Sequence, residues 1–538
     1  MRSSALPRPA LLALAWMFLV GAAIALRPIL PIDETRYVSV AWEMWVRGDF
    51  LVPHLNGVPY SDKPPLLFWM FHLGWWFFGV NDWWPRVVPA LFALANLGLT
   101  ARLARRLWPD RPEVAGSAPA VLLGFLIWSV FTTMVMFDML VAFCVLLALL
   151  GLEEAWRRGG VRPWLQVGGA LGVGILAKGP VVLVLPLAVA FSAPWWGREI
   201  PRQFSSLWWP RLAGAVGLTA AIALAWALPA AAAGGAEYAN AILVSQTEQR
   251  VVYSYAHNHP WWWYLPLLPL LLYPYSFWPP LWKAVFAAFA ALRRRAADPG
   301  LRFCLAWLVP GLLVFSLISG KQPHYLLPLM PCFALIAARL LTETGVPVRR
   351  WHLLPALSLL VLTGAALVVV PLLSPRLGPR HGLPSWSPDV SLGMGVTLIA
   401  LAAASFLLFD RIFARRTAAP TLITLALVIG VHLGLSEAAR EAYDLEPIAR
   451  YLSVAEKQGR PIAYVGDYHG QFHFLGRLER PLQEIPGGSE SLWIRQNPRG
   501  KVIQDLKYMP PDVNRAEFTQ PYRDDVLAVW GREGLPGG

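Results

Sequence analysis

Long apolar runs alternate with short polar connections along most of this chain. Runs of about 20 apolar residues are long enough to cross a bilayer as helices, and thirteen of them lie near residues 10–30, 66–100, 115–130, 133–152, 164–178, 180–197, 210–232, 262–290, 302–319, 324–342, 352–373, 391–410 and 420–438. The boundaries between residues 115 and 200 stay open. The pattern predicts an α-helical polytopic membrane protein of about 13 transmembrane helices, with the chain ends on opposite faces.

The first long polar segment, residues 31–65, is the centre of the prediction. Its sequence is PIDETRYVSVAWEMWVRGDFLVPHLNGVPYSDKPP. Apolar and polar stripes at helical spacing predict an amphipathic helix lying on the membrane surface: Val38, Ala41, Trp42 and Trp45 against Arg36, Ser39, Glu43 and Arg47. The alternative is that Asp33 only caps this helix and the remainder is a solvated loop.

The composition changes after about residue 442. Residues 443–538 are polar and mixed, and they contain no spanning run. A helix over Glu446–Gln458, a buried strand over Ile462–Val465, a turn and a second short strand are expected here. We therefore predict a transmembrane domain over 1–442, with external interfacial helices in 31–65, and a small external α/β domain over 443–538.

Charge decides the orientation. Only 15% of the 538 residues are charged, against about 25% in soluble domains. Although the net charge is +13, the basic residues are scattered over short connections, which indicates membrane orientation and not nucleic-acid binding. Every second connection is Arg-rich, as at 102–111, 157–162, 198–202, 293–295, 349–350 and 411–416. The positive-inside rule places these in the cytoplasm with the N-terminus, and residues 10–26 are an uncleaved first helix or, alternatively, a signal peptide.

The connections predicted to face outward contain the polar residues that could take part in catalysis or binding. Besides segment 31–65 they include Asp138, Lys178 in AKGP, Lys321 in SGKQPHY and the loop Gly234–Pro260. An ionisable group at membrane depth is costly unless it is paired or functional, although each alone could be a snorkelling or helix-end residue. Their collection on one face predicts a single external site. Asp467, His469 and His473 fit a polar turn better than a metal site.

The motifs, in order, resemble a known family. They are IDETRY, RGDFLVPHLNGVPYSDKPPLLFW, MFDML, AKGP, EQRV, HPWWWYLP and SGKQPHYLLPLMP, between Ile32 and Pro331. This series is similar to bacterial membrane glycosyltransferases related to the 4-amino-4-deoxy-L-arabinose transferase of lipid A and to protein O-mannosyltransferases. The resemblance implies a GT-C fold and sugar transfer from undecaprenyl phosphate to an acceptor at the periplasmic face of the bacterial inner membrane.

The resemblance also implies roles for single residues. Asp33 and Asp138 match acidic catalytic positions. The candidate substrate-binding residues are Glu34, Tyr60, Asp62, Lys63, Lys178, Arg250, Lys321, His324 and Tyr325. Among these, Tyr60, Lys63, Arg250 and Tyr325 match residues at the carrier phosphate. Asp62 stands where relatives commonly carry Glu, so any role that depends on the reach of the longer side chain is in doubt.

These roles are chemically consistent. Fixed Lys and Arg donors stabilise the growing charge of a leaving phosphate, which suits Lys63 and Arg250. Asp33 would take the proton of a hydroxyl acceptor, or position the acceptor if that is a phosphate, and displacement would invert the anomeric centre. We expect no obligate metal, with a candidate divalent site near Asp62, His257 and His259.

Substrates and some alternatives remain open. The acceptor is lipid A, another envelope glycan or a protein, and the loop Gly234–Pro260 is an acceptor-facing lid or a structural connection. Neither the sugar nor the oligomeric state is readable from the sequence. The alternative functions are protein O-mannosyltransferase-like transfer, transport of a lipid-linked sugar, and recruitment of partners by the external domain.

Overall fold

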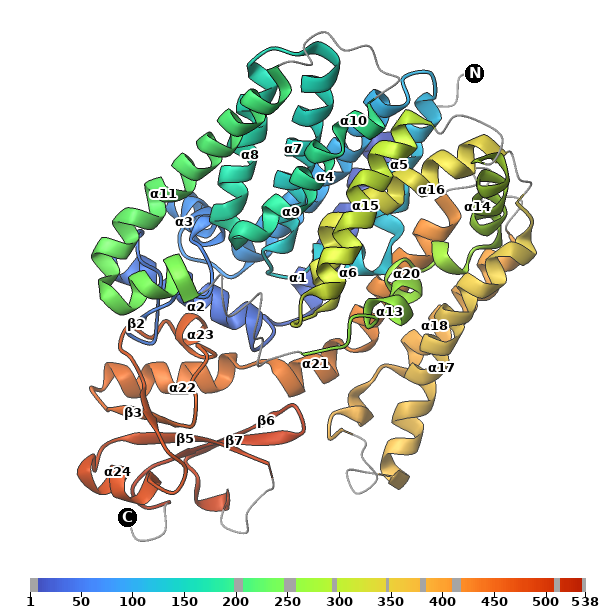
Figure 1. Cartoon of the computed structure of the whole chain (residues 1–538). Coiled ribbons are helices and arrows are strands. Elements are labelled where there is room, and N and C mark those ends of the chain that lie inside the picture. Colours follow the sequence, from blue (N-terminus) through green and yellow to red (C-terminus); the bar gives the residue numbers. More distant parts are fainter. Residues whose placement is uncertain are drawn as a thin grey trace.

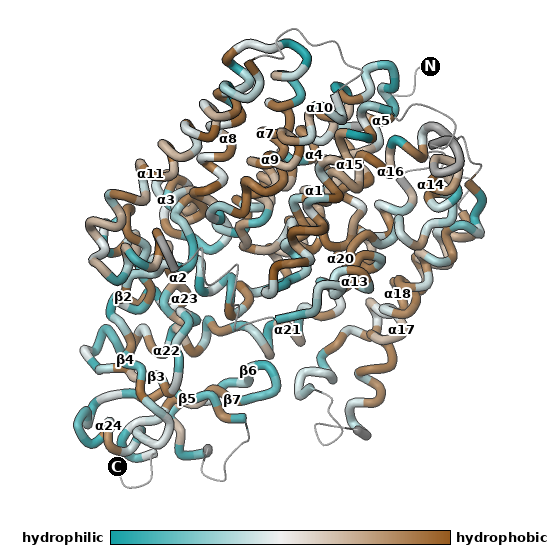
Figure 2. Tube along the Cα trace, viewed as in Figure 1, coloured by the Kyte–Doolittle hydropathy of each residue, from teal (hydrophilic) through white to brown (hydrophobic). Residues whose placement is uncertain are grey.

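Helices form most of the chain, and a small sheet lies at its C-terminal end (Figure 1). The computed structural model describes residues 8–197, 207–245, 258–292, 298–344, 348–377, 384–408, 418–507 and 513–534. Apolar residues concentrate in the helical bundle, whereas hydrophilic residues dominate the sheet region and the segments next to it (Figure 2). The predicted division into two domains at residue 442 stays a prediction.

The bundle is built from the segments predicted to be apolar. Its helices are α1 (Arg8–Leu26), α2 (Asp33–Arg47), α3 (Leu66–Phe78), α4 (Trp83–Leu107), α5 (Pro112–Gly124), α6 (Leu126–Thr132), α7 (Asp138–Arg158), α8 (Arg162–Lys178), α9 (Val184–Phe191), α10 (Ala193–Trp196), α11 (Trp208–Asn240), α13 (Tyr264–Leu271), α14 (Pro279–Leu292), α15 (Pro299–Leu317), α16 (Met330–Thr344), α17 (Leu354–Leu377), α18 (Leu392–Leu407), α20 (Ala418–Gly434) and α21 (Ser436–Tyr443). Short 3₁₀ turns precede α9, α16 and α17, and the turn before α16 is η5 (Pro323–Leu329).

The predicted count of 13 spans differs from what the helices provide. Among the described residues, seven helices are long and apolar enough to cross a membrane, or up to nine if each of two bent pairs is one span. Predicted run 66–100 is broken between α3 and α4, and run 262–290 between α13 and α14. Prolines at 274, 279 and 280 explain the second break, since proline lacks the backbone N–H that a continuous helix needs. Seven to nine such helices among the described residues still indicate a multi-pass membrane protein.

Helix α2 confirms the predicted amphipathic helix and ends at Gly48, whose φ of 66° suits glycine. Residues from both stripes, however, are buried against the C-terminal region, namely Ser39 of the polar stripe and Trp42 of the apolar stripe. Ser39 Oγ donates to the Gly470 carbonyl (2.6 Å), and Trp42 Nε1 donates to the Leu478 carbonyl (2.7 Å). Helix α2 therefore contacts residues 470–478 of the C-terminal region as well as the rest of the bundle.

The C-terminal region is a mixed sheet with helices. It comprises α22 (Glu446–Lys457), β3 (Ile462–Val465), α23 (His473–Gly476), β4 (Gln483–Ile485), α24 (Glu490–Gln496), β5 (Lys501–Leu506), β6 (Phe518–Tyr522) and β7 (Asp525–Trp530). The strand order is β4-β3-β5-β7-β6. Pairs β3–β4 and β3–β5 are parallel, whereas β5–β7 and β6–β7 are antiparallel.

Two local predictions for this region are confirmed and one is wrong. The helix after Glu446 and the strand Ile462–Val465 are present. The predicted second short strand is instead the one-turn helix α23, because its backbone pairs locally, with the Gly476 N–H donating to the Phe472 carbonyl over 2.8 Å. Phe474 stacks on Trp75 of the bundle with centroids 5.4 Å apart. Helix α21 runs to Tyr443, so the exact boundary between the two domains stays a prediction.

We predict that Trp42→Phe loosens this region from the bundle. An aromatic ring is kept, although phenyl is smaller than indole, and the Leu478 carbonyl loses its donor, which should lower the free energy of unfolding by about 1–3 kcal/mol. Thermal unfolding of the purified protein in detergent measures this. Trp76→Phe is the matched control, because Trp76 is 81% exposed. Equal stability of the two variants would contradict the prediction.

Candidate functional site

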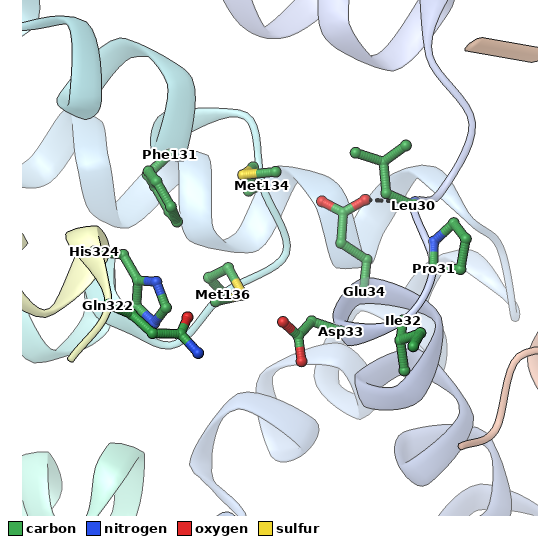
Figure 3. A pocket seen from close by; sticks show the side chains of 10 residues that line it. All are labelled: Leu30, Pro31, Ile32, Asp33, Glu34, Phe131, Met134, Met136, Gln322 and His324. Atoms are coloured by element: carbon green, nitrogen blue, oxygen red, sulfur yellow. Dashed lines mark hydrogen bonds between the residues drawn. The ribbon is translucent and has the colours of Figure 1, made fainter. Parts of the chain in front are cut away.

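A cavity of about 220 Å³ lies where the start of α2 meets the segment after α6 and the start of η5. Its lining consists of Leu30, Pro31, Ile32, Asp33, Glu34, Phe131, Met134, Met136, Gln322 and His324. The Asp33 carboxylate points into this space, and Gln322 and His324 face it from the opposite wall (Figure 3). Two of the predicted motifs, IDETRY and SGKQPHY, therefore meet at one place.

The adjacent acids Asp33 and Glu34 have opposite environments. The Asp33 side chain is 52% exposed, and Arg36 Nη1 lies 3.9 Å from its Oδ1. Because the N-cap residue of α2 is Ile32 and no side chain caps the helix, the interpretation of Asp33 as a cap is not supported. Asp33 is thus an accessible carboxylate at the cavity.

Glu34 is instead fully engaged inside the protein. Arg27 Nη1 donates to Oε2 (2.5 Å) and Arg27 Nη2 to Oε1 (3.0 Å). The backbone N–H groups of Leu30 and Val135 each donate over 2.8 Å. Burial raises the pKa of Glu34, but Arg27 and these N–H groups outweigh it and hold the pKa below its ordinary value. Glu34 is therefore a structural clamp in the cavity wall, and its predicted contact with substrate stays a prediction.

A second charged pair lies beside the cavity. Asp138 begins α7 and Lys178 ends α8, and Nζ of Lys178 is 2.6 Å from Oδ1 of Asp138. Lys178 Nζ also lies 4.8 Å above the centre of the Tyr325 ring. The His324 ring packs against Tyr325 with centroids 4.8 Å apart. The motifs MFDML, AKGP and KQPHY are thus brought together, and pairing reduces the cost of burying these charges.

The segment after α2 reaches the same site. Tyr60 is buried, which raises the pKa of its hydroxyl; the charge of Asp62 adds to this, whereas Arg36 opposes it. Asp33 and Lys63 lie close enough to His324 for an electrostatic interaction with its ring. The same holds for Asp138 and Lys178. Asp62 and Lys63 each interact with neighbouring groups as well.

Arg36 was missed as a site residue. It lies beside both Asp33 and Tyr60, whereas the sequence suggested only a member of a polar stripe. The spacing in the sequence could have predicted this proximity, because a residue three positions after Asp33 shares a helix face with it.

Other predicted residues lie elsewhere. Lys321 Nζ donates to the carbonyls of His259 (2.8 Å) and Ile318 (2.5 Å), so it holds a connection together and does not line this cavity. Arg250 and His257 lie outside the described residues, as does the rest of 246–257 within the predicted lid Gly234–Pro260. The lid and the role of Arg250 stay predictions.

Within the described ranges, no group of three or more His, Cys, Asp or Glu side chains could hold a metal ion. His473 is used in packing: Nδ1 lies 2.8 Å from the Tyr468 hydroxyl, and Nε2 lies 3.2 Å from the Arg480 carbonyl. The expectation about metals stays a prediction, since His257 of the candidate set is not described.

Sequence comparison identifies similar proteins. Residues 62–226 match the family model of dolichyl-phosphate-mannose-protein mannosyltransferases. The undecaprenyl phosphate-alpha-4-amino-4-deoxy-L-arabinose arabinosyl transferase of Erwinia tasmaniensis is 31% identical over 333 residues, which cover 60% of this chain and 57% of the relative. The corresponding transferase 1 of Pseudomonas fluorescens is 32% identical over 318 residues, covering 58% and 55%. The matches thus span little more than half the length of these relatives.

Comparison of structures extends the similarity to almost the whole chain. ArnT from Cupriavidus metallidurans bound to undecaprenyl phosphate superposes with a TM-score of 0.71 at 21% identity, covering 97% of this chain and 96% of that one. The apo form of the same protein gives 0.71 at 20% identity, covering 98% of both chains. The predicted resemblance is confirmed, and the fold is the GT-C fold of ArnT.

We predict that Glu34→Gln destabilises the protein at neutral pH. Removing one charge of the buried pair leaves Arg27 unpaired, which should cost about 3–5 kcal/mol. Because the folded pKa lies below the ordinary value of 4.5, this stabilisation is complete above pH 4.5 and is lost as the pH falls through the folded value. Unfolding measured from pH 7 to pH 3 should show the difference from wild type shrinking on acidification.

The control for this experiment is Asp467→Asn, which neutralises an exposed acid. It should stay close to wild type at every pH. A Glu34→Gln variant as stable as wild type at pH 7 would show that the clamp contributes little.

Proposed function

We propose that this chain is an inverting glycosyltransferase that moves a sugar from undecaprenyl phosphate to an acceptor at the periplasmic face of the bacterial inner membrane. The observation that carries the proposal is the accessible Asp33 carboxylate in a cavity opposite His324. The charges of Lys63, Lys178 and Asp138 act on the same His324. The similar proteins support it, because they are named for an undecaprenyl phosphate-linked donor and one is bound to undecaprenyl phosphate.

The proposed sugar is 4-amino-4-deoxy-L-arabinose and the proposed acceptor is lipid A. The names of the relatives support the sugar. A cavity of about 220 Å³ is smaller than the roughly 300–1,000 Å³ of pockets for drug-sized ligands, which favours a monosaccharide. Transfer to a protein is the second candidate, because residues 62–226 match a protein mannosyltransferase family.

In the proposed reaction, an acceptor oxygen attacks the anomeric carbon from the face opposite the phosphate. A bond forms between that oxygen and the anomeric carbon, while the bond from that carbon to the phosphate oxygen breaks. The bonding electrons leave with undecaprenyl phosphate, and the configuration inverts. Asp33 takes the proton of a hydroxyl acceptor, or positions the acceptor if that is already a phosphate anion. Lys63 and Tyr60, with Arg250, stabilise the leaving phosphate.

Helix α7 supports the proposed orientation. It begins at the site with Asp138 and ends with Arg157 and Arg158 after 21 residues. At about 1.5 Å per residue it is roughly 30 Å long, which matches the hydrocarbon core of a bilayer. The positive-inside rule then places its Arg-rich end in the cytoplasm and the site outside. The N-terminus is correspondingly cytoplasmic and residues 443–538 are periplasmic.

We predict that Asp33→Asn lowers transfer by about 10²–10⁴-fold, the usual contribution of a general base. The amide has nearly the shape of the carboxylate, so the variant should fold, insert into the membrane and bind undecaprenyl phosphate. Mass spectrometry of envelope lipids and periplasmic proteins, from cells with and without the gene and with the variant, identifies the product and its loss. Asp467→Asn is the control, and unchanged product in Asp33→Asn cells would exclude Asp33 as the base.

We also predict that transfer does not need a metal ion, because fixed cations such as Lys63 can stabilise the leaving phosphate. Treating the purified enzyme with a chelator should leave the transfer rate unchanged. Complete loss of transfer that one divalent ion restores would contradict this prediction and direct attention to Asp62 and His259.

A further inference from the structure

One side chain fastens the first external segment to the edge of the C-terminal sheet. Asn56 Nδ2 donates to the Leu482 carbonyl (3.0 Å), and the Leu482 backbone N–H donates to Asn56 Oδ1 (2.8 Å). This reciprocal pairing is how two strand residues bind each other. Leu482 immediately precedes β4, an edge strand of the sheet. The Asn56 amide therefore occupies backbone groups that an edge would otherwise expose.

The backbone around Asn56 is shaped for this contact. Asn56 and Gly57 form the turn between β1 (His54–Leu55) and β2 (Val58–Pro59), with φ values of 53° and 86°. Two positive φ angles in a two-residue hairpin turn favour the sequence Asn-Gly. A Cβ atom on Gly57 would lie 2.8 Å from Cγ of Pro481. Both turn residues are thus fitted closely to the C-terminal region.

The same turn is also tied to α2. The Gly57 backbone N–H donates to Oε1 of Glu43 over 2.8 Å, and that oxygen also pairs with Arg47. Glu43 belongs to the polar stripe that faces the C-terminal region. The hairpin tip is therefore held from two directions, by α2 and by the edge of the sheet.

From this anchor the chain leads directly to the proposed carrier site. The Tyr60 backbone N–H donates to the Pro53 carbonyl (2.7 Å), which continues the hairpin pairing beyond β2. Lys63 follows three residues later and precedes two prolines that open α3. Little free chain separates the anchored turn from Tyr60 and Lys63, so the hairpin largely determines their placement.

We propose that Asn56 is a positioning residue through which the C-terminal region holds Tyr60 and Lys63 for the carrier phosphate. This inference rests on the proposed function of the site. Asn56 touches no reacting atom; it acts through the hairpin. The C-terminal region is then a working part of the donor site.

Asn56→Gly in the full chain, reconstituted in lipid nanodiscs, tests the proposal. Glycine adopts the positive φ without strain, so only the amide is lost. We expect affinity for undecaprenyl phosphate to fall about tenfold, the range for one hydrogen-bonding group, and kcat/KM for the sugar donor to fall by at least a similar factor. Hydrogen exchange should become faster at the amides of Val58, Tyr60 and residues 61–63. Asn56→Asp, which places a carboxylate oxygen against the Leu482 carbonyl and Oε1 of Glu484, should weaken binding at least as much as Asn56→Gly.

Asn497→Ala is the control variant. It removes a hydrogen bond from Asn497 Nδ2 to the Trp493 carbonyl (3.1 Å), inside the C-terminal region and away from the hairpin. Wild-type affinity and exchange in Asn56→Gly would overturn the inference, and so would equal effects from Asn497→Ala. If the wild type does not bind undecaprenyl phosphate, the proposed function fails, while exchange at residues 58–63 still decides whether Asn56 fixes this segment.

Discussion

The buried pair between Arg27 and Glu34 is the interaction on which the cavity depends. Burying two charges costs several kcal/mol unless hydrogen bonds compensate for the lost water. Here each Glu34 oxygen accepts two donors, from the end of α1, the segment before α2 and the segment before α7. Three elements are thereby fixed around one carboxylate. Neighbouring residues of a helix point about 100° apart. When Glu34 points toward Arg27, the side chain of Asp33 therefore points to a different side, which here is the cavity.

The charged residues divide into those used to build the site and those left accessible to substrate. Asp138 and Lys178 neutralise each other at helix ends, and their side chains are only 3% and 13% exposed. Asp33 is half exposed, and the 3.9 Å between its Oδ1 and Arg36 Nη1 is at the limit of an ion pair. A group that must exchange protons with a ligand needs such access, whereas a buried, paired carboxylate mainly fixes geometry. The exposure of Asp33 is therefore the strongest physical reason to place the chemistry there.

The sequence predicted the helices and strands of this protein better than it predicted the hydrogen-bond partners of single side chains. The apolar periodicity of α2 was sufficient to find the helix, and the order of motifs was sufficient to bring Asp33, Asp138, Lys178 and Tyr325 to one region. It could not separate Asp33 from Glu34, since their difference arises from Arg27 and a backbone N–H at residue 135. Nor could it show that Lys321 binds nearby carbonyls. Local patterns give element type, but hydrogen-bond partners depend on packing.

The amphipathic pattern of α2 illustrates this limit most clearly. An apolar stripe opposite a polar one is equally suited to a membrane surface and to an interface with a folded domain. What decides between them is Ser39 and Trp42 pairing with carbonyls more than 400 positions away. Such pairing commits the side of α2 that carries Ser39 and Trp42, while its first turn supplies the cavity acid. The helix that carries Asp33 therefore cannot move independently of the C-terminal sheet, and the site belongs to both parts of the chain.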